Sequence, residues 1–313
     1  MSSEEIDYRL ILNDCGLGIR PASVVVKNIE NLDEHYDSTT LTDIYNYCLI
    51  NITDPEILMG IIKISDTRRN STTLNILLNM LQLSIRQDNE QQNDELINLR
   101  VLCTKAIANY KDTASVKILL DCLNNKKEHY RVRLACADAL GRIGDRFAVR
   151  PLINLVEDEE EKSVYLKESA TFALGILGDT SAIDPLVAIL ESKHGVLDKF
   201  SFLKEKIVEA LGKLNINSTK VMKALKSSLM DSSPMVRINA IEAIMNSEEP
   251  NAVELIKPSL NDEDDEVKKN ALIALYNLIG RDILDEVIDL PIYTNYLKDV
   301  AKELIDEYEE EDE

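Results

Sequence analysis

One type of charged residue recurs along this chain at a nearly constant interval. A base stands seven positions before the second residue of six Ala-Leu or Ala-Ile pairs, at Arg100, Arg133, Lys167, Lys204, Arg237 and Lys268. This ladder of bases could bind an acidic ligand, or it could form ion pairs inside the fold. Acids precede two of the bases, in "LMDSSPMVR" and "NDEDDEVKK". We therefore favour a structural role, in which Asp231 pairs with Arg237. In the next unit, Asp262 or Asp264 would pair with Lys268.

No group of histidines, cysteines and acids has the spacing of a metal or catalytic site. The histidines lie far apart, and the sequence contains no Gly-rich phosphate loop, nucleophile elbow or H-E-x-x-H motif. The five cysteines form no C-x-x-C pair and have apolar neighbours, which predicts free, buried thiols at Cys15, Cys48, Cys103, Cys122 and Cys136. The sequence thus predicts no catalytic residue, no cofactor and no metal site, and it favours a protein that is not an enzyme.

The charge balance limits the classes of partner. The chain has 56 acidic against 35 basic side chains and a formal net charge of -21, which disfavours nucleic acids and anionic membranes. No apolar run reaches the roughly eighteen residues of a membrane span, and acids occupy the start of the chain where a secretory signal would have bases. We therefore expect a cytoplasmic protein.

The elements that carry the recurring bases are expected to be helices. Leu, Ile, Ala, Glu and Lys dominate the composition, only 10 glycines occur, and tryptophan is absent. The second residues of the six pairs are spaced by 33, 34, 37, 33 and 31 positions. Four positions before each lies a small or aliphatic residue, which makes an apolar stripe along one helix face at Cys103, Cys136, Ala170, Ile207, Ala240 and Ala271.

A stop signal follows each of the two clearest helices. In "GRIGDRFA" and "GILGDTSA", Gly144 and Gly178 can take the left-handed conformation that ends a helix, and the aspartate that follows can cap the next one. Pro151 and Pro185 stand near the start of the second helices, where the missing N–H costs least. Each unit is therefore a helical hairpin of about 33 residues.

Such hairpins bury their apolar faces only by stacking, so we predict an all-α fold, a right-handed α-solenoid of two-helix repeats. A Gln-, Asn- and acid-rich stretch interrupts the pattern near residue 90, and acids end the chain. The predicted organisation is degenerate helical repeats over 1–83, a polar loop or linker over 84–95, the repeat array over 96–290, and a capping helix with an acidic tail over 291–313.

Two neighbouring units carry a resemblance to a known family. The segments "VRLACADALGRIGDRFAVRPLINLV" and "KESATFALGILGDTSAIDPLVAIL" resemble HEAT repeats, specifically the HEAT-like repeats of phycobilisome lyases. The resemblance covers residues 99–190 best and extends to Leu278. It implies that the second helices line a concave surface, which would present one row of polar residues, Lys117, Arg150, Asp184, Lys223 and Glu254, and Asn154 one turn further along. The mixed charges of this second-helix row suggest a polypeptide partner.

The third clear unit is longer than the others. The additional residues fall in "ESKHGVLDKFSFLKEK", which contains two of the four phenylalanines, Phe200 and Phe202. Insertions between repeats form loops that often lie on the binding side. Because aromatic residues are enriched at interfaces, we predict that these two contribute to partner binding.

Two functional hypotheses follow. The first is a non-catalytic scaffold or adaptor that binds another protein or protein segment. The second is a bilin lyase or isomerase subunit, because the repeats and the stretched unit are similar to those of phycobilisome lyase subunits. Other enzymes built from such repeats fit less well, since deoxyhypusine hydroxylation uses paired His-Glu motifs and this chain has no His-Glu dipeptide. HEAT-like DNA glycosylases would require a basic, aromatic-rich groove.

Overall fold

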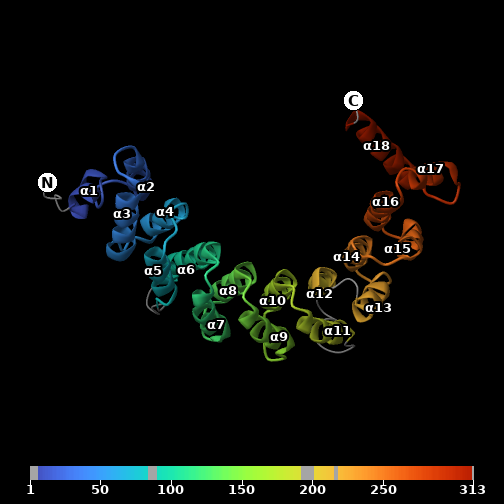
Figure 1. The fold of residues 1–313 in the computed structure, drawn as a ribbon, viewed down its shortest axis with the longest axis horizontal. Coiled ribbons are helices and arrows are strands. Elements are labelled where there is room, and N and C mark those ends of the chain that lie inside the picture. Colours follow the sequence, from blue (N-terminus) through green and yellow to red (C-terminus); the bar gives the residue numbers. More distant parts are fainter. Residues whose placement is uncertain (1–5, 84–89, 192–200, 215–217, 312–313) are drawn as a thin grey trace. The chain divides into compact units, whose positions relative to one another are not determined.

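The helical hairpins predicted from the sequence are present in a computed structural model, which describes residues 6–83, 90–191, 201–214 and 218–311 (Figure 1). The described residues form α-helices and short 3-10 helices, with no strand among them. The fold is therefore an all-α solenoid, as predicted.

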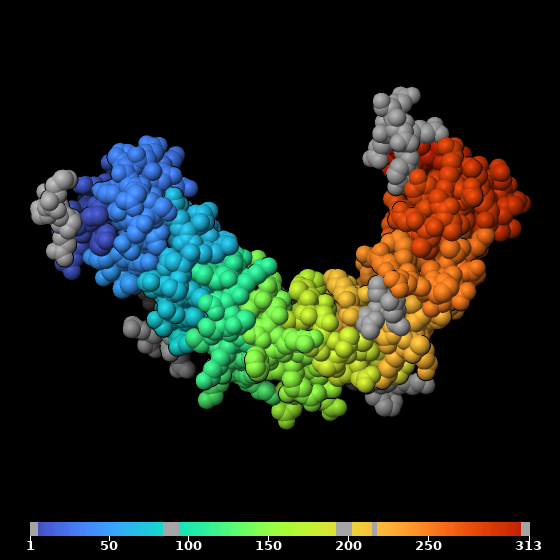
Figure 2. All heavy atoms as spheres, viewed as in Figure 1, coloured from blue at the N-terminus to red at the C-terminus, as the bar shows by residue number. Residues whose placement is uncertain are grey.

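The chain divides into two compact units, Met1–Ala148 and Val149–Glu313. Unit 1 contains α1 (Tyr8–Asp14), α2 (Ala22–Glu30), α3 (Ser38–Asn51), α4 (Pro55–Ser65), α5 (Ser71–Leu81), α6 (Glu90–Tyr110), α7 (Val116–Asn124) and α8 (Tyr130–Ile143). Unit 2 contains α9 (Val149–Glu157), α10 (Val164–Leu177), α11 (Ile183–Glu191), α12 (Ser201–Leu214), α13 (Thr219–Ser228), α14 (Pro234–Met245), α15 (Ala252–Ile256), α16 (Asp265–Ile279), α17 (Asp282–Asp289) and α18 (Asn295–Glu311). Side chains fill the spaces between neighbouring helices of each unit (Figure 2).

Two predicted segments, the linker over 84–95 and the repeat array over 96–290, differ in detail from the structure. Helix α6 begins at Glu90, so the second half of the predicted loop or linker over 84–95 is helical, and residues 84–89 lie outside the described part. Glu and Gln are good helix formers, and the packed turns that follow extend the helix back into this polar stretch. The boundary between the compact units, after Ala148, falls inside the stretch that was predicted as one array.

The predicted turn chemistry is confirmed. Gly144 and Gly178 end α8 and α10 with φ angles of 82° and 68°, which a glycine adopts without strain. The carboxylate of Asp179 accepts a hydrogen bond from the backbone N–H of Ser181 at 3.0 Å, and Asp145 accepts one from Phe147 at 2.9 Å. Each cap starts a short 3-10 turn that leads into the second helix of the hairpin.

The predicted apolar stripe forms the core. All of its small or aliphatic members are fully buried, and so are the Leu or Ile residues four positions later, which are Ile107, Leu140, Leu174, Leu211, Ile244 and Leu275.

The first helices of unit 2 pack closely along one row. Helices α10, α12, α14 and α16 contact one another in sequence, whereas the second helices α9, α11 and α13 contact one another less extensively. A Cβ atom added to Gly175 would lie 3.3 Å from the Cβ atom of Ala210, and one added to Gly212 would lie 2.7 Å from that of Ala243. These small residues allow the close approach. Within unit 2, the first helices accordingly lie on the inner side of the bend and the second helices on its outer side (Figure 1).

The close contact between α12 and α14 leads to a stability prediction. We expect Gly212→Ala to lower the free energy of unfolding by about 1 to 2 kcal/mol, because overpacking costs about 1 to 3 kcal/mol and the better helix propensity of Ala returns up to about 1 kcal/mol. Urea unfolding followed by circular dichroism measures the change. In a double-mutant cycle with Ala243→Gly, the two substitutions together should cost less than the sum of the single changes. Strict additivity would show that these helices are not in close contact.

Candidate functional site

The ladder of bases lies inside the fold. Five of the six side chains are buried, and Lys204 is partly exposed. Arg133 Nε donates to the carbonyl oxygen of Leu123 at 2.8 Å, and Lys167 Nζ donates to the carbonyl oxygen of Val156 at 3.0 Å. These carbonyls belong to the last turn of the preceding second helix, where helix geometry leaves them without a partner. The pKa of Lys167 is lowered by burial, although nearby acids favour its charge. The favoured structural role of the ladder is therefore confirmed.

The acids that pair with the bases differ from the predicted ones. Arg237 pairs with Asp262 of the next repeat, with Nη2 2.6 Å from Oδ1, and contacts Asp231 only through that residue's backbone oxygen. The carboxylate of Asp231 instead lies 3.2 Å from Lys204 Nζ. Each of these acids precedes a first helix that packs beside the previous first helix, so the base one repeat earlier can reach it. The pairing is thus offset by one repeat.

The second predicted pair also differs. Lys268 Nζ lies 2.7 Å from Asp265, three residues earlier in the first turn of the same helix, and not beside Asp262 or Asp264. Asp262 is already held by the Arg237 guanidinium, and Asp264 caps helix α16 by accepting hydrogen bonds from backbone N–H groups.

The ladder has one more member than the sequence analysis identified. Lys298 of α18 donates to the carbonyl oxygen of Ile288, near the end of α17, at 2.8 Å. The sequence contained a signal for it, since buried Ala301 follows three positions later and Ile305 seven positions later, as in the other units. Helix α18 is therefore built as the first helix of a further unit.

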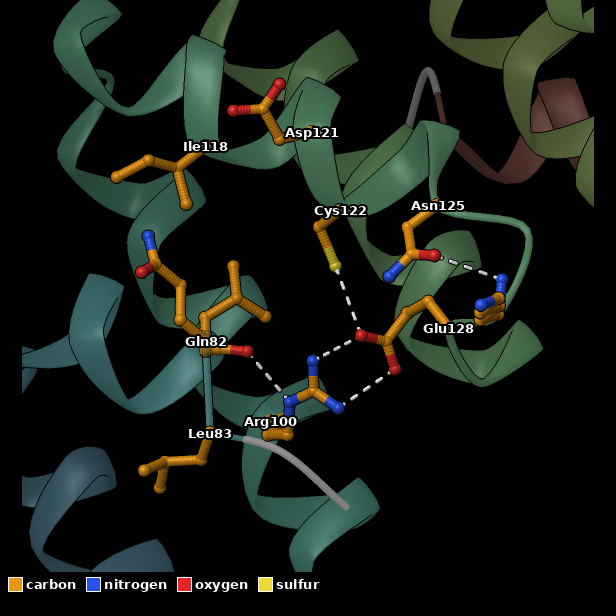
Figure 3. A pocket seen from close by; sticks show the side chains of 10 residues that line it. Gln82, Leu83, Arg100, Ile118, Asp121, Cys122, Asn125 and Glu128 are labelled. Carbon is orange, nitrogen blue, oxygen red and sulfur yellow. Dashed lines mark hydrogen bonds and ion pairs between the residues drawn. The ribbon is translucent and has the colours of Figure 1, made fainter.

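An open pocket of about 500 Å³ lies where the ladder begins in unit 1 (Figure 3). In its floor, the Arg100 guanidinium pairs with Glu128, with Nη1 2.9 Å from Oε1, and Nε donates to the carbonyl oxygen of Leu81 at 2.8 Å. Cys122 Sγ lies 3.9 Å from Glu128, and its side chain is only partly buried, unlike the other four cysteines and unlike its prediction. Since the charged groups in the floor pair with each other, they serve the fold.

The second-helix row predicted from the family resemblance is solvent-exposed. Its members lie on α7, α9, α11, α13 and α15 at Lys117, Arg150, Asn154, Asp184, Lys223 and Glu254. Asp184 pairs with Lys220, at 2.6 Å, and Lys223 lines an open cleft of about 710 Å³ beside the turn at 248–250. In unit 2, the second helices that carry the four charged members of this row lie on the outer side of the bend, not on the predicted concave side, because the first helices are the more closely packed ones (Figure 1).

The structure describes only one of the two phenylalanines of the stretched unit. Phe200 lies outside the described residues, so its prediction stands unchanged. Phe202 lies in the first turn of α12, not in a loop, and 65% of its side chain is exposed.

Phe202 belongs to a row that the sequence analysis did not identify. The residues two positions before Lys167, Lys204 and Arg237 are Tyr165, Phe202 and Met235, which are 70%, 65% and 49% exposed. They occupy equivalent positions on α10, α12 and α14, which contact one another. Phe172 and Ile176 of α10 are also exposed. We call the exposed surface of these three helices the first-helix face.

Charged residues of α12 lie beside Phe172 of α10 on the first-helix face. The ammonium groups of Lys206 and Lys213 lie 5.7 and 5.0 Å from the ring centroid of Phe172. Both also pair with Glu209, at 2.8 and 2.6 Å. Burial opposes the charge of Glu209, but the hydrogen bonds from the two lysines outweigh it and lower its pKa. Exposed apolar side chains in a contiguous group are typical of an interaction site.

Comparisons with known proteins agree with this repeat structure. HEAT repeats match residues 90–165 and 198–276, and the PBS lyase HEAT-like repeat matches residues 166–192. The chain belongs to the HEAT-repeat family. A search of curated proteins finds no match. Among the described residues of this HEAT-repeat protein, no helix combines the length and apolar character that crossing a membrane requires.

Several solved structures are similar to this chain. Kap95p, in a structure with RanGDP, is 13% identical over 98% of this chain and 47% of its own, with a TM-score of 0.59. Kap121p bound to the extreme C-terminus of the protein phosphatase Cdc14p is 11% identical over 96% of this chain and 38% of its own, with a TM-score of 0.50. The CpcE–CpcF complex of phycocyanin lyase from Nostoc sp. PCC7120 is 22% identical over 75% of this chain and 94% of that chain, with a TM-score of 0.46.

Proposed function

We propose that this HEAT-repeat protein is a non-catalytic scaffold or adaptor that binds a polypeptide partner. The observation that carries the proposal is the exposed apolar row Tyr165, Phe202 and Met235, which repeats on successive first helices. Burying such side chains against a partner is favourable, and aromatic residues are the usual energetic centres of interfaces. Kap95p and Kap121p, which share the fold, are each seen with a protein partner.

The binding surface we propose is the first-helix face of unit 2. The helices that carry it lie on the inner side of that unit's bend (Figure 1), and Phe202 and its two neighbours in the row are exposed on them. The second-helix row is the competing surface. It is polar, and its Asp184 is already paired with Lys220.

An affinity capture with matched variants tests this choice. Phe202→Ala combined with Tyr165→Ala should weaken binding of the principal partner about tenfold or more, because removal of buried aromatic anchors costs about 2 kcal/mol or more at interface centres. Lys223→Ala combined with Arg150→Ala should leave binding within about twofold, because exposed charges at a rim contribute little. Native lysate is passed over each immobilised variant, and the retained proteins are quantified by mass spectrometry and then titrated individually.

The two pairs of substitutions separate the surfaces. Loss of the partner only from the Lys223 and Arg150 variant would move the site to the second-helix row. A chain that retains no protein in stoichiometric amount would contradict the scaffold function itself. Circular dichroism of both variants checks that each is folded.

A bilin lyase or isomerase subunit is the second candidate function. The match of residues 166–192 to the PBS lyase HEAT-like repeat favours it. The same capture distinguishes the two functions. A lyase subunit should retain a phycobiliprotein subunit and should promote attachment of a bilin to it, which visible absorbance detects. A scaffold of another pathway should do neither.

A further inference from the structure

The charges beside the apolar row point to the chemistry of the partner. Resting on the proposed function, we infer that the partner presents a basic segment, in which Lys or Arg side chains stand next to apolar anchors, to the α10–α12 part of the first-helix face. The relevant groups are the partly exposed carboxylates of Glu168 on α10 and Glu205 on α12, two helices that contact each other.

Each of the two carboxylates follows an exposed aromatic residue by three positions. Glu168 follows Tyr165 by three positions on α10, and Glu205 follows Phe202 by three positions on α12. Residues three apart lie on the same face of a helix, about one turn from each other. Each exposed aromatic side chain of the row therefore has an acid beside it.

Both acids already have neighbours on the protein. Lys206, which favours the charge of Glu168, has its Nζ atom 2.8 Å from Glu209 and 5.7 Å from the ring centroid of Phe172. Glu205 Oε1 accepts a hydrogen bond from Ser233 Oγ at 3.1 Å. The pKa of Glu168 is raised, first by burial and also by the charge of Glu205, and Lys206 offsets this rise only in part, so the charge of Glu168 lacks full compensation. A cation supplied by a partner would provide that compensation.

Helix α14, the third helix of the row, indicates which residues of the partner would be basic and which would be apolar. On α14, Met235 is followed three positions later by Ile238, so this position is apolar where α10 and α12 have acids. A partner segment that crosses the three helices would thus place its cations over α10 and α12 and an apolar residue over α14. An acidic segment in the same place would add like charges, which costs binding energy.

The charge of the whole chain supports the same inference. At -21, the protein attracts a basic segment from a distance and accelerates its encounter, an effect that weakens as salt is added. Binding should therefore be strongest at low ionic strength.

A peptide selection on the full chain tests the inference. A phage-displayed library of random twelve-residue peptides is selected on the immobilised protein, and the enriched peptides are synthesised and titrated by fluorescence anisotropy. We expect peptides with a net positive charge and at least one aromatic or large aliphatic residue. Glu168→Gln with Glu205→Gln should weaken their binding about five- to tenfold, the effect of roughly 1 to 1.4 kcal/mol of lost charge pairing, and should flatten the salt dependence.

Matched controls distinguish this inference from the proposed function. Glu157→Gln, at an exposed acid of α9 outside both candidate surfaces, should leave peptide binding unchanged. Peptides that bind through Phe202 but are acidic or neutral would overturn the inference and leave the scaffold function standing. Peptides whose affinity is unchanged by Phe202→Ala would overturn both the proposed face and the inference. Failure to enrich any peptide would contradict both proposals.

Discussion

Replacing Glu128 by Ala is expected to lower the free energy of unfolding by about 3 to 5 kcal/mol, the usual cost of leaving one member of a buried ion pair without its partner. The side chain of Glu128 is 9% exposed and that of Arg100 is 4% exposed. Without the carboxylate, the Arg100 guanidinium would remain buried, and its Nε–H group would still donate to the carbonyl oxygen of Leu81. Urea unfolding measured by circular dichroism gives the change.

An exposed ion pair provides the matched control for this experiment. Asp184 and Lys220 approach to 2.6 Å, but their side chains are 77% and 51% exposed. Asp184→Ala should therefore change the free energy of unfolding by only about 0 to 1 kcal/mol. Similar losses in the two variants would show that burial does not set the cost, and that the ladder of bases is a surface feature.

A double substitution further separates charge from packing. In Arg100→Met with Glu128→Leu, no charge remains buried, so the loss should be smaller than that of Glu128→Ala alone. A loss as large as that of the single variant would assign the stability to the hydrogen bond with Leu81 and not to the ion pair.

Replacing Leu174 by Ala is expected to cost about 2 to 5 kcal/mol, because truncation of a buried leucine removes apolar contacts and leaves a cavity. Leu174 is 1% exposed and lies on α10, in the interior of unit 2. Since the stability of stacked repeats is roughly a sum of unit and nearest-neighbour contributions, the unfolding transition should also broaden or show an intermediate.

The same helix offers the control for Leu174. Ile176 is two residues away, loses the same number of carbon atoms on replacement by Ala, and is 44% exposed on the first-helix face. Ile176→Ala should cost about 1 kcal/mol or less, since a partly exposed side chain forfeits less burial. Equal losses would mean that the helical register read from the Ala-Leu period is wrong.

Two findings of the structure, the seventh base and the exposed apolar row, have a regular spacing that can be found in the sequence. Lys298, with Ala301 and Ile305 at the regular spacing, follows the same rule as the other six bases, but the less regular end of the chain concealed it. The row of Tyr165, Phe202 and Met235 also has a constant position, two before each base. A periodic sequence shows which positions are equivalent, but it does not show whether an equivalent apolar residue is buried or exposed.

The amino-acid sequence by itself determined the features that depend on neighbours within a few residues. These are the helices, their glycine stops, the aspartate caps at Asp145 and Asp179, and the buried stripe, because φ preference, capping and the period of 3.6 residues act locally. Only the tertiary structure decided how helices about 33 residues apart meet. It paired Arg237 with Asp262, placed Gly212 against Ala243, and left Phe202 exposed on a first helix of unit 2. These contacts depend on the distances between packed helices. The distances are set by the volumes of the side chains on both helices, and no local sequence pattern specifies them.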